Sequence, residues 1–75
     1  MPGSVRFRKF GNKIHISWLV GRSNVASFSV DSFNGVIIDK KKAGVPSARD
    51  IHTLCQILQR YNERDTVNKI LNRYN

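Results

Sequence analysis

The stretch that decides the fold is residues 5–18, VRFRKFGNKIHISW. Within it, Gly11-Asn12 is a two-residue turn signal of the kind that joins two antiparallel strands. Closing the hairpin at Phe10 and Lys13 sets its register, and side chains alternate between the two faces of a strand. The stretch therefore predicts one apolar face and one basic face. The apolar face carries Val5, Phe7, Ile14, Ile16, Trp18 and Val20, and the basic face carries Arg6, Arg8, Phe10, Lys13, His15 and Ser17.

The second turn is predicted from the requirement that apolar residues stay on the apolar face. A five-residue loop over residues 21–25 meets this requirement, because it sets Trp18 opposite Phe28. A four-residue loop would set Trp18 opposite Ser27 and mix the faces. The preferred register also places His15 opposite Asp31 on the basic face, where we expect a structural cross-strand pair.

The third turn contains Asn34-Gly35 and is predicted in the same way. A three-residue loop over residues 33–35, with Gly35 left-handed, sets Val30 opposite Ile38. A two-residue loop, which sets Val30 opposite Asp39, is the second choice. The fourth strand is then expected over residues 36–41, which completes a four-stranded antiparallel meander.

Helices are predicted after the sheet and a basic loop over residues 40–46. Ser47 followed by Asp50 resembles a capping box, so a helix should begin there and end near Tyr61. Asn62 or Asp65 can cap a second short helix, or the first helix continues with a bend. The apolar stripes that should cover the sheet are Ile51, Leu54, Cys55 and Leu58 in the first helix, and Val67, Ile70, Leu71 and Tyr74 in the second.

These elements predict a single α+β domain over residues 1–75, with the sheet at about 4–41 and the helical part at about 47–74. At the level of the fold, this architecture resembles small sheet-plus-helix nucleic-acid binders such as the N-terminal arm-binding domains of phage-type integrases and the single-strand binders of the transcriptional coactivator type. The features that carry the resemblance are Gly11-Asn12 between basic strands and Ser47 at a helix start. Both features are generic, and a shared fold does not by itself imply a function.

The charge of the chain indicates its partner. Thirteen Lys and Arg residues against five Asp and Glu residues give a net charge of +8, which favours polyanions as ligands. The excess is concentrated in the first 30 residues, which contain no acid. We therefore expect a nucleic-acid-binding protein, with DNA favoured over RNA. The alternative is a protein-interaction module, such as a small regulatory or host-directed viral or phage protein, that docks its basic face on an acidic partner.

The sheet face without helices is the expected binding site. Cations beside an aromatic and small polar residues suit phosphate contacts combined with base stacking. Phe10 either stacks on bases or anchors the hairpin, and the lysine loop can extend the binding surface. The candidate nucleic-acid-binding residues are Arg6, Arg8, Phe10, Lys13, His15, Arg22, Lys40, Lys41 and Lys42.

Catalysis is not expected, because the sequence contains no Ser-His-Asp or Cys-His arrangement, carboxylate pair or glycine-rich phosphate loop. His52 and Cys55 have helical i, i+3 spacing, but a metal site needs three or four ligands. Cys55 is better interpreted as a core residue. The sequence therefore predicts no enzyme, no metal and no cofactor.

The expected location is intracellular, in the cytoplasm, nucleoid or nucleus. A single cysteine cannot form an intramolecular disulfide, and the first residues lack the apolar run of a secretory signal. No segment is apolar over the ~18 residues that a membrane span requires, and a membrane-surface partner is not expected. Because a core of this size stabilises a fold only modestly, a homodimer is left open.

Overall fold

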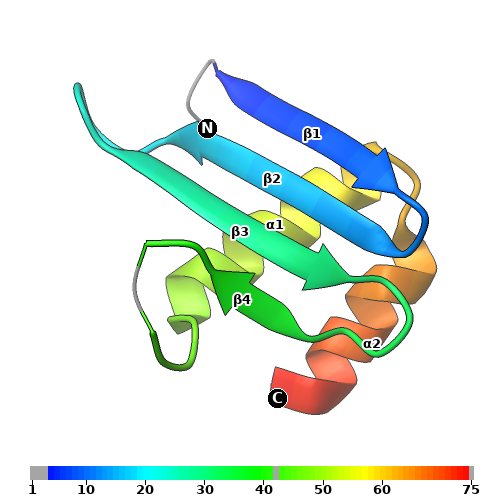
Figure 1. Cartoon of the computed structure of the whole chain (residues 1–75). Helices are drawn as coiled ribbons and strands as arrows, with labels where there is room; N and C mark the ends of the chain where they lie inside the picture. The colour runs from blue at the N-terminus through cyan, green and yellow to red at the C-terminus, as the bar shows by residue number, and fades with distance from the viewer. Residues whose placement is uncertain (1–3, 42, 75) are drawn as a thin grey trace.

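The fold is α+β, as the sequence predicts, with a four-stranded antiparallel sheet followed by two helices. The computed structural model describes residues 4–41 and 43–74. The strands lie in the order β1-β2-β3-β4, and both helices pack on one side of the sheet (Figure 1). The elements are β1 (Val5–Phe10), β2 (Lys13–Leu19), β3 (Val25–Asp31), β4 (Ile37–Asp39), α1 (Ala48–Arg60) and α2 (Arg64–Tyr74).

The first hairpin has the predicted register. Phe10 pairs with Lys13 next to the Gly11-Asn12 turn, and Val5 pairs with Trp18 at the other end. Gly11 has a φ of +59°, which a glycine adopts without the penalty that a side chain imposes. The turn residues therefore specify this part of the sheet locally.

The pairing of β2 with β3 differs from the prediction by two residues. Trp18 lies opposite Ala26 rather than Phe28, and Leu19 lies opposite Val25. The loop between β2 and β3 is shorter than predicted, because the backbone N–H of Val20 donates to the carbonyl of Asn24 at 2.9 Å. A shift of two residues leaves every side chain on its predicted face, so alternation alone cannot detect it.

The predicted contact between His15 and Asp31 is lost through this shift. His15 lies opposite Ser29, and Asp31 lies opposite Lys13. The expected cross-strand pair of His15 with Asp31 is therefore wrong, and Asp31 faces a lysine instead.

The pairing of β3 with β4 is also corrected, and here the faces change. Val30 lies opposite Ile37, whereas the preferred loop sets it opposite Ile38 and the second choice opposite Asp39. The strands close at Asp31, whose N–H donates to the carbonyl of Val36 at 2.9 Å. A shift of one residue exchanges the faces, so Ile37 is 4% exposed and Ile38 is 54% exposed.

Side-chain caps stabilise this longer loop over residues 32–35. The Asp31 carboxylate accepts the N–H of Phe33 at 2.8 Å, and the Asn34 side-chain carbonyl accepts the N–H of Val36 at 3.0 Å. Such local bonds favour a turn over continued strand pairing. Gly35 is left-handed as predicted, with a φ of +74°. The strand that follows is shorter than the predicted 36–41.

Helix α1 begins at the predicted cap, where the Ser47 hydroxyl accepts the N–H of Asp50 at 3.2 Å. It ends near Tyr61 as predicted, with Tyr61 as its C-cap, but Asn62 terminates α1 instead of capping α2. Asn62 has a φ of 62°, and the N–H of Glu63 donates to the carbonyl of Leu58 at 2.9 Å. The left-handed Asn62 and this hydrogen bond form a Schellman-type C-terminus, a motif in which a left-handed residue ends the helix.

Helix α2 is a separate helix that begins after Glu63. Glu63 accepts the N–H of Val67 on its carbonyl and the hydroxyl of Thr66 on its carboxylate. Neither Asn62 nor Asp65 therefore caps α2, which corrects the prediction. Neither helix in the described residues is long and apolar enough to cross a membrane.

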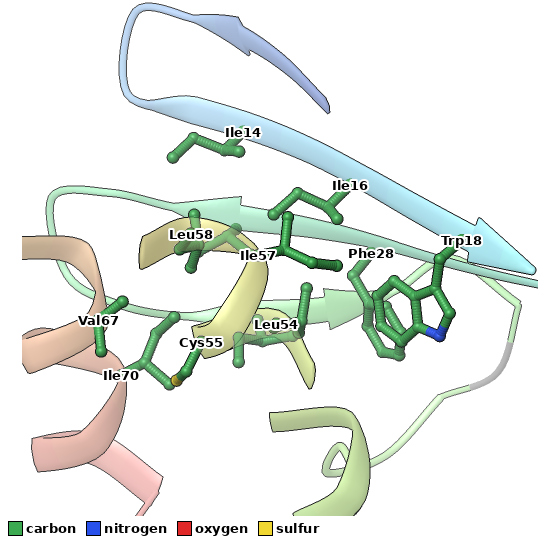
Figure 2. Close-up of a cluster of buried hydrophobic side chains, with 12 residues drawn as sticks. Ile14, Ile16, Trp18, Phe28, Leu54, Cys55, Ile57, Leu58, Val67 and Ile70 are labelled. Carbon is green, nitrogen blue, oxygen red and sulfur yellow. The ribbon is translucent and has the colours of Figure 1, made fainter. Parts of the chain in front are cut away.

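The core lies between the sheet and the helices (Figure 2). Trp18 stacks on Phe28 with ring centroids 5.3 Å apart, and the stripe of α1 packs beneath them. In α2, Thr66 is buried, whereas the predicted stripe residue Leu71 is 42% exposed. The buried hydrophobic residues are Ile14, Ile16, Trp18, Phe28, Val30, Ile37, Leu54, Cys55, Ile57, Leu58, Val67 and Ile70.

Candidate nucleic-acid interface

One face of the sheet is not covered by either helix, and we call it the open face (Figure 1). The strand registers and the alternation of side chains define its members. The open face consists of Arg6, Arg8 and Phe10 from β1, Lys13, His15, Ser17 and Leu19 from β2, Val25, Ser27, Ser29 and Asp31 from β3, and Ile38 from β4.

In the row of the open face that contains Ser17, long cationic side chains lie at both ends and short side chains lie between them. Arg6 is in register with Ser17, which pairs with Ser27. The N–H of Lys40 donates to the carbonyl of Ser27 at 2.9 Å, so Lys40 continues this row beyond β4. Since neighbouring strands are about 4.8 Å apart, the row spans roughly 14 Å from Arg6 to Lys40. This row of the open face is thus basic at both ends, with only the short side chains of serines between them.

Two adjacent hollows lie along β1 and β2, and the larger one also reaches Val5 and Trp18, whose side chains belong to the helix-covered face. One, of about 200 Å³, is lined by Arg6, Arg8, His15, Ile16, Ser17 and Ser27. The other, of about 500 Å³, is lined by Ser4, Val5, Arg6, Ser17, Trp18, Leu19 and Val25. Because Arg6 and Ser17 line both, the hollows are neighbours, and we call them together the open-face groove.

Phe10 lies at the end of the open face nearest the first turn. Its side chain is 62% exposed, and its ring meets that of His15 edge-on with centroids 6.3 Å apart. Lys13 and Asp31 lie opposite each other in the same row of the sheet. Among the residues that the structure describes, Asp31 is the only acid on the open face, and its carboxylate already accepts the N–H of Phe33. The edge-on contact leaves much of the Phe10 ring available to a ligand.

The other candidate residues extend the surface at the opposite end of the sheet. Arg22 is exposed in the loop between β2 and β3. Lys40 and Lys41 lie just after β4; Lys41 is exposed, and its N–H donates to the Asp39 carboxylate at 2.8 Å. Lys42, the remaining candidate, lies outside the described residues.

Several other cations are bound on the helical side. Lys9 forms a salt bridge with Glu63 at 2.9 Å between Nζ and Oε2. Lys69 donates to the carbonyl of Phe33 at 2.8 Å, and Arg73 donates to the carbonyl of Asn34 at 3.0 Å. Lys9 thus attaches β1 to the junction between α1 and α2, and Lys69 and Arg73 attach α2 to the turn between β3 and β4, whereas Arg6 and Arg8 point away from the helices.

The residues considered for metal ligation are separated by their environments. His52 is exposed, whereas Cys55 is 7% exposed and belongs to the core. Burial raises the pKa of the Cys55 thiol above its usual value, because desolvation disfavours the thiolate. A protonated, buried thiol is suited to packing and not to metal binding or nucleophilic attack.

Val25 lines the groove, although the sequence predicts it in the loop over residues 21–25. The two-residue register difference brings it into β3 opposite Leu19. Leu19 and Val25 are 36% and 38% exposed, and both line the groove. Ser29, Ser27 and Val25 alternate along the sequence, and this alternation is the signal that could have placed Val25 on the open face of β3.

No known family model matches the chain, and neither a curated protein nor a solved structure matches it.

Proposed function

We propose that this chain is a nucleic-acid-binding protein without catalytic activity, and that the open face is its binding surface. The observation that carries the proposal is the gathering of Arg6, Arg8 and Lys13 on the sheet face that no helix covers. Guanidinium groups bind phosphates through two parallel hydrogen bonds, and sheet surfaces with serines and aromatics add contacts to sugars and bases.

Three cations on the helical side are already engaged within the protein, whereas Arg49, Arg60 and Arg64 of the helices are exposed as Arg6 and Arg8 are. On the helical side, Lys9 is already paired with Glu63, and Lys69 and Arg73 bind carbonyls of the turn between β3 and β4. Arg6 and Arg8 border a groove instead. A phosphate bound there meets cations without first breaking a structural contact.

A salt titration of binding tests the proposed function. If about five to seven phosphates are neutralised, log K should fall against log salt with a slope of roughly −4 to −6 on duplex DNA, and roughly −3.5 to −5 on single strands. Fluorescence anisotropy with labelled oligonucleotides of both kinds measures these slopes. Absence of binding to both at low salt, together with a defined complex with one acidic protein, would replace the proposal by the protein-interaction alternative.

Arg8 and Lys9 provide a matched pair of variants, because they are adjacent and carry the same charge. Arg8→Ala should weaken nucleic-acid binding about tenfold, since hydrogen bonds to charged groups contribute about 1.5–3 kcal/mol. Lys9→Ala should leave affinity near that of the unmodified protein, because Lys9 points to Glu63. Its effect on stability should be about 0–1 kcal/mol, as for other exposed ion pairs.

Anisotropy titrations and thermal melts of both variants check this prediction. Equal losses of affinity for Arg8→Ala and Lys9→Ala would show that only net charge matters. A larger loss for Lys9→Ala would place the ligand on the helical side.

A further inference from the structure

We infer that the ligand of the open face is a single strand of nucleic acid and not a duplex, an inference that rests on the proposed function. Three features of the open face support it: the height of its side chains, its exposed apolar groups and the direction of its groove.

The serines on the central strands of the open face are too short to read a duplex. The major groove of B-DNA is about 8.5 Å deep, so a sheet that reads it needs long side chains on the strands that enter it. Beside Arg6 and Arg8, the central strands β2 and β3 present the short side chains of Ser17, Ser27 and Ser29. The longer Lys13 and His15 of β2 lie nearer the first turn. A duplex laid across the serines would therefore find no long side chain there to reach its base edges.

The apolar groups on the open face match the faces of bases. Phe10 is 62% exposed at one end, and Leu19 and Val25 lie side by side at the other. In a duplex each base face is covered by its neighbours in the stack, so these side chains would find no partner. A single strand can turn its bases onto such surfaces, and stacking on aromatic side chains is a main source of its affinity.

The groove has the direction of the strands, since its lining runs from Arg8 and His15 to Ser4 and Leu19. It follows β1 and β2, and the open face measures roughly 20 Å from the row of Phe10 to the row of Leu19, at about 3.3 Å per residue. Arg6 and Arg8 lie along one side of it, spaced to bind phosphates in succession. A strand can therefore lie in the groove with its phosphates toward β1 and a base on Leu19, and it reaches Phe10 where it continues past Arg8 beyond the groove.

Competition between two probes tests the inference. We would measure, at one salt concentration, the affinity for an oligothymidylate of about 12 nucleotides, within the usual site size of single-strand binders. The comparison probe is a mixed-sequence duplex of the same length. The single strand should bind at least about tenfold more tightly. Phe10→Ala should weaken single-strand binding about 5- to 150-fold, as expected for loss of one stacked base, and change duplex binding little.

Phe33 supplies the control for Phe10. It is also a solvent-exposed phenylalanine, at 72%, but Lys69 of α2 lies over its ring at 5.2 Å from the centroid. Phe33→Ala should leave single-strand affinity unchanged within about twofold. Equal losses for both variants would overturn the stacking contact.

The outcomes separate this inference from the proposed function. Salt-dependent binding with equal or tighter affinity for the duplex would overturn the single-strand inference and leave the proposed function intact. Single-strand preference that Phe10→Ala does not change would overturn stacking on Phe10. Absence of binding to both probes at low salt would overturn the proposed function and the inference together.

Discussion

Trp18→Ala is expected to leave the chain largely unfolded. Trp18 is 5% exposed and stacks on Phe28 at one end of the core (Figure 2). Truncating a buried tryptophan costs about 3–5 kcal/mol, through lost burial and the cavity left behind. The core of a domain this small rarely supplies more than about 3–5 kcal/mol in total. The substitution therefore removes most or all of the free energy of unfolding.

Circular dichroism during thermal and urea denaturation measures this effect. Phe10→Ala is the matched control, because it truncates an exposed aromatic on the other face of the same sheet. The control should melt near the temperature of the unmodified protein. Cooperative melting of Trp18→Ala at that temperature would show that Trp18 is not a core residue.

Gly35→Ala should also destabilise the fold strongly, by about 3 kcal/mol or more, because it combines a backbone clash with a strained φ. A Cβ atom on Gly35 would lie 2.7 Å from the carbonyl carbon of Lys69 and 2.8 Å from the backbone nitrogen of Ile70. These are backbone atoms of α2, so the helix itself must move to make room. The left-handed φ of +74° adds about 1–2 kcal/mol for any residue with a side chain.

Gly11→Ala separates the two contributions. Gly11 is also left-handed, with a φ of +59°, but beyond its chain neighbours nothing lies within 4 Å of the position that a Cβ atom would take. This variant should therefore show only the backbone cost of about 1–2 kcal/mol. Urea denaturation of both variants gives the difference. Equal destabilisation would mean that α2 does not pack against Gly35 as closely as the structure indicates.

The first hairpin and the helix boundaries show how much of the fold is local. Gly11-Asn12 and the alternation around it specify every pair between β1 and β2. Ser47 begins α1 through one hydrogen bond to Asp50, three residues ahead. Interactions between residues this close in sequence depend little on the rest of the molecule, and so they can be predicted from the sequence.

The registers of β3 and β4 could not be predicted from interactions between residues close in sequence. For β2 and β3, a register shifted by two residues satisfies the alternation equally well, and the compact turn after Val20 decides between the two. For β4, the loop is held by the Asp31 and Asn34 side chains and by contacts with α2. Tyr74, near the end of α2, accepts the N–H of Ile37 at 2.8 Å. The contacts with α2 join residues far apart in sequence.

The candidate site likewise has one part that the sequence predicts and one part that it does not. Alternation in residues 5–18 places Arg6, Arg8 and Phe10 on one face, and the structure has them there. The groove depends on a second strand pair, because its far end needs Val25 opposite Leu19. The end of the groove at Leu19 and Val25 therefore cannot be predicted from the sequence of the first hairpin alone.

The sequence by itself determined the fold class, the β1–β2 register and the placement of Arg6, Arg8 and Lys13 on the uncovered sheet face. The reason is that turn chemistry, helix caps and the two-residue period of a strand act over a few neighbouring residues. Only the tertiary structure decided the registers of β3 and β4, the burial of Ile37 in place of Ile38, and the groove. The β2–β3 register and the groove depend on the compact turn that Val20 and Asn24 close, and the features of β4 depend on how α2 packs against the sheet. Both select among registers that the residue pattern leaves equivalent.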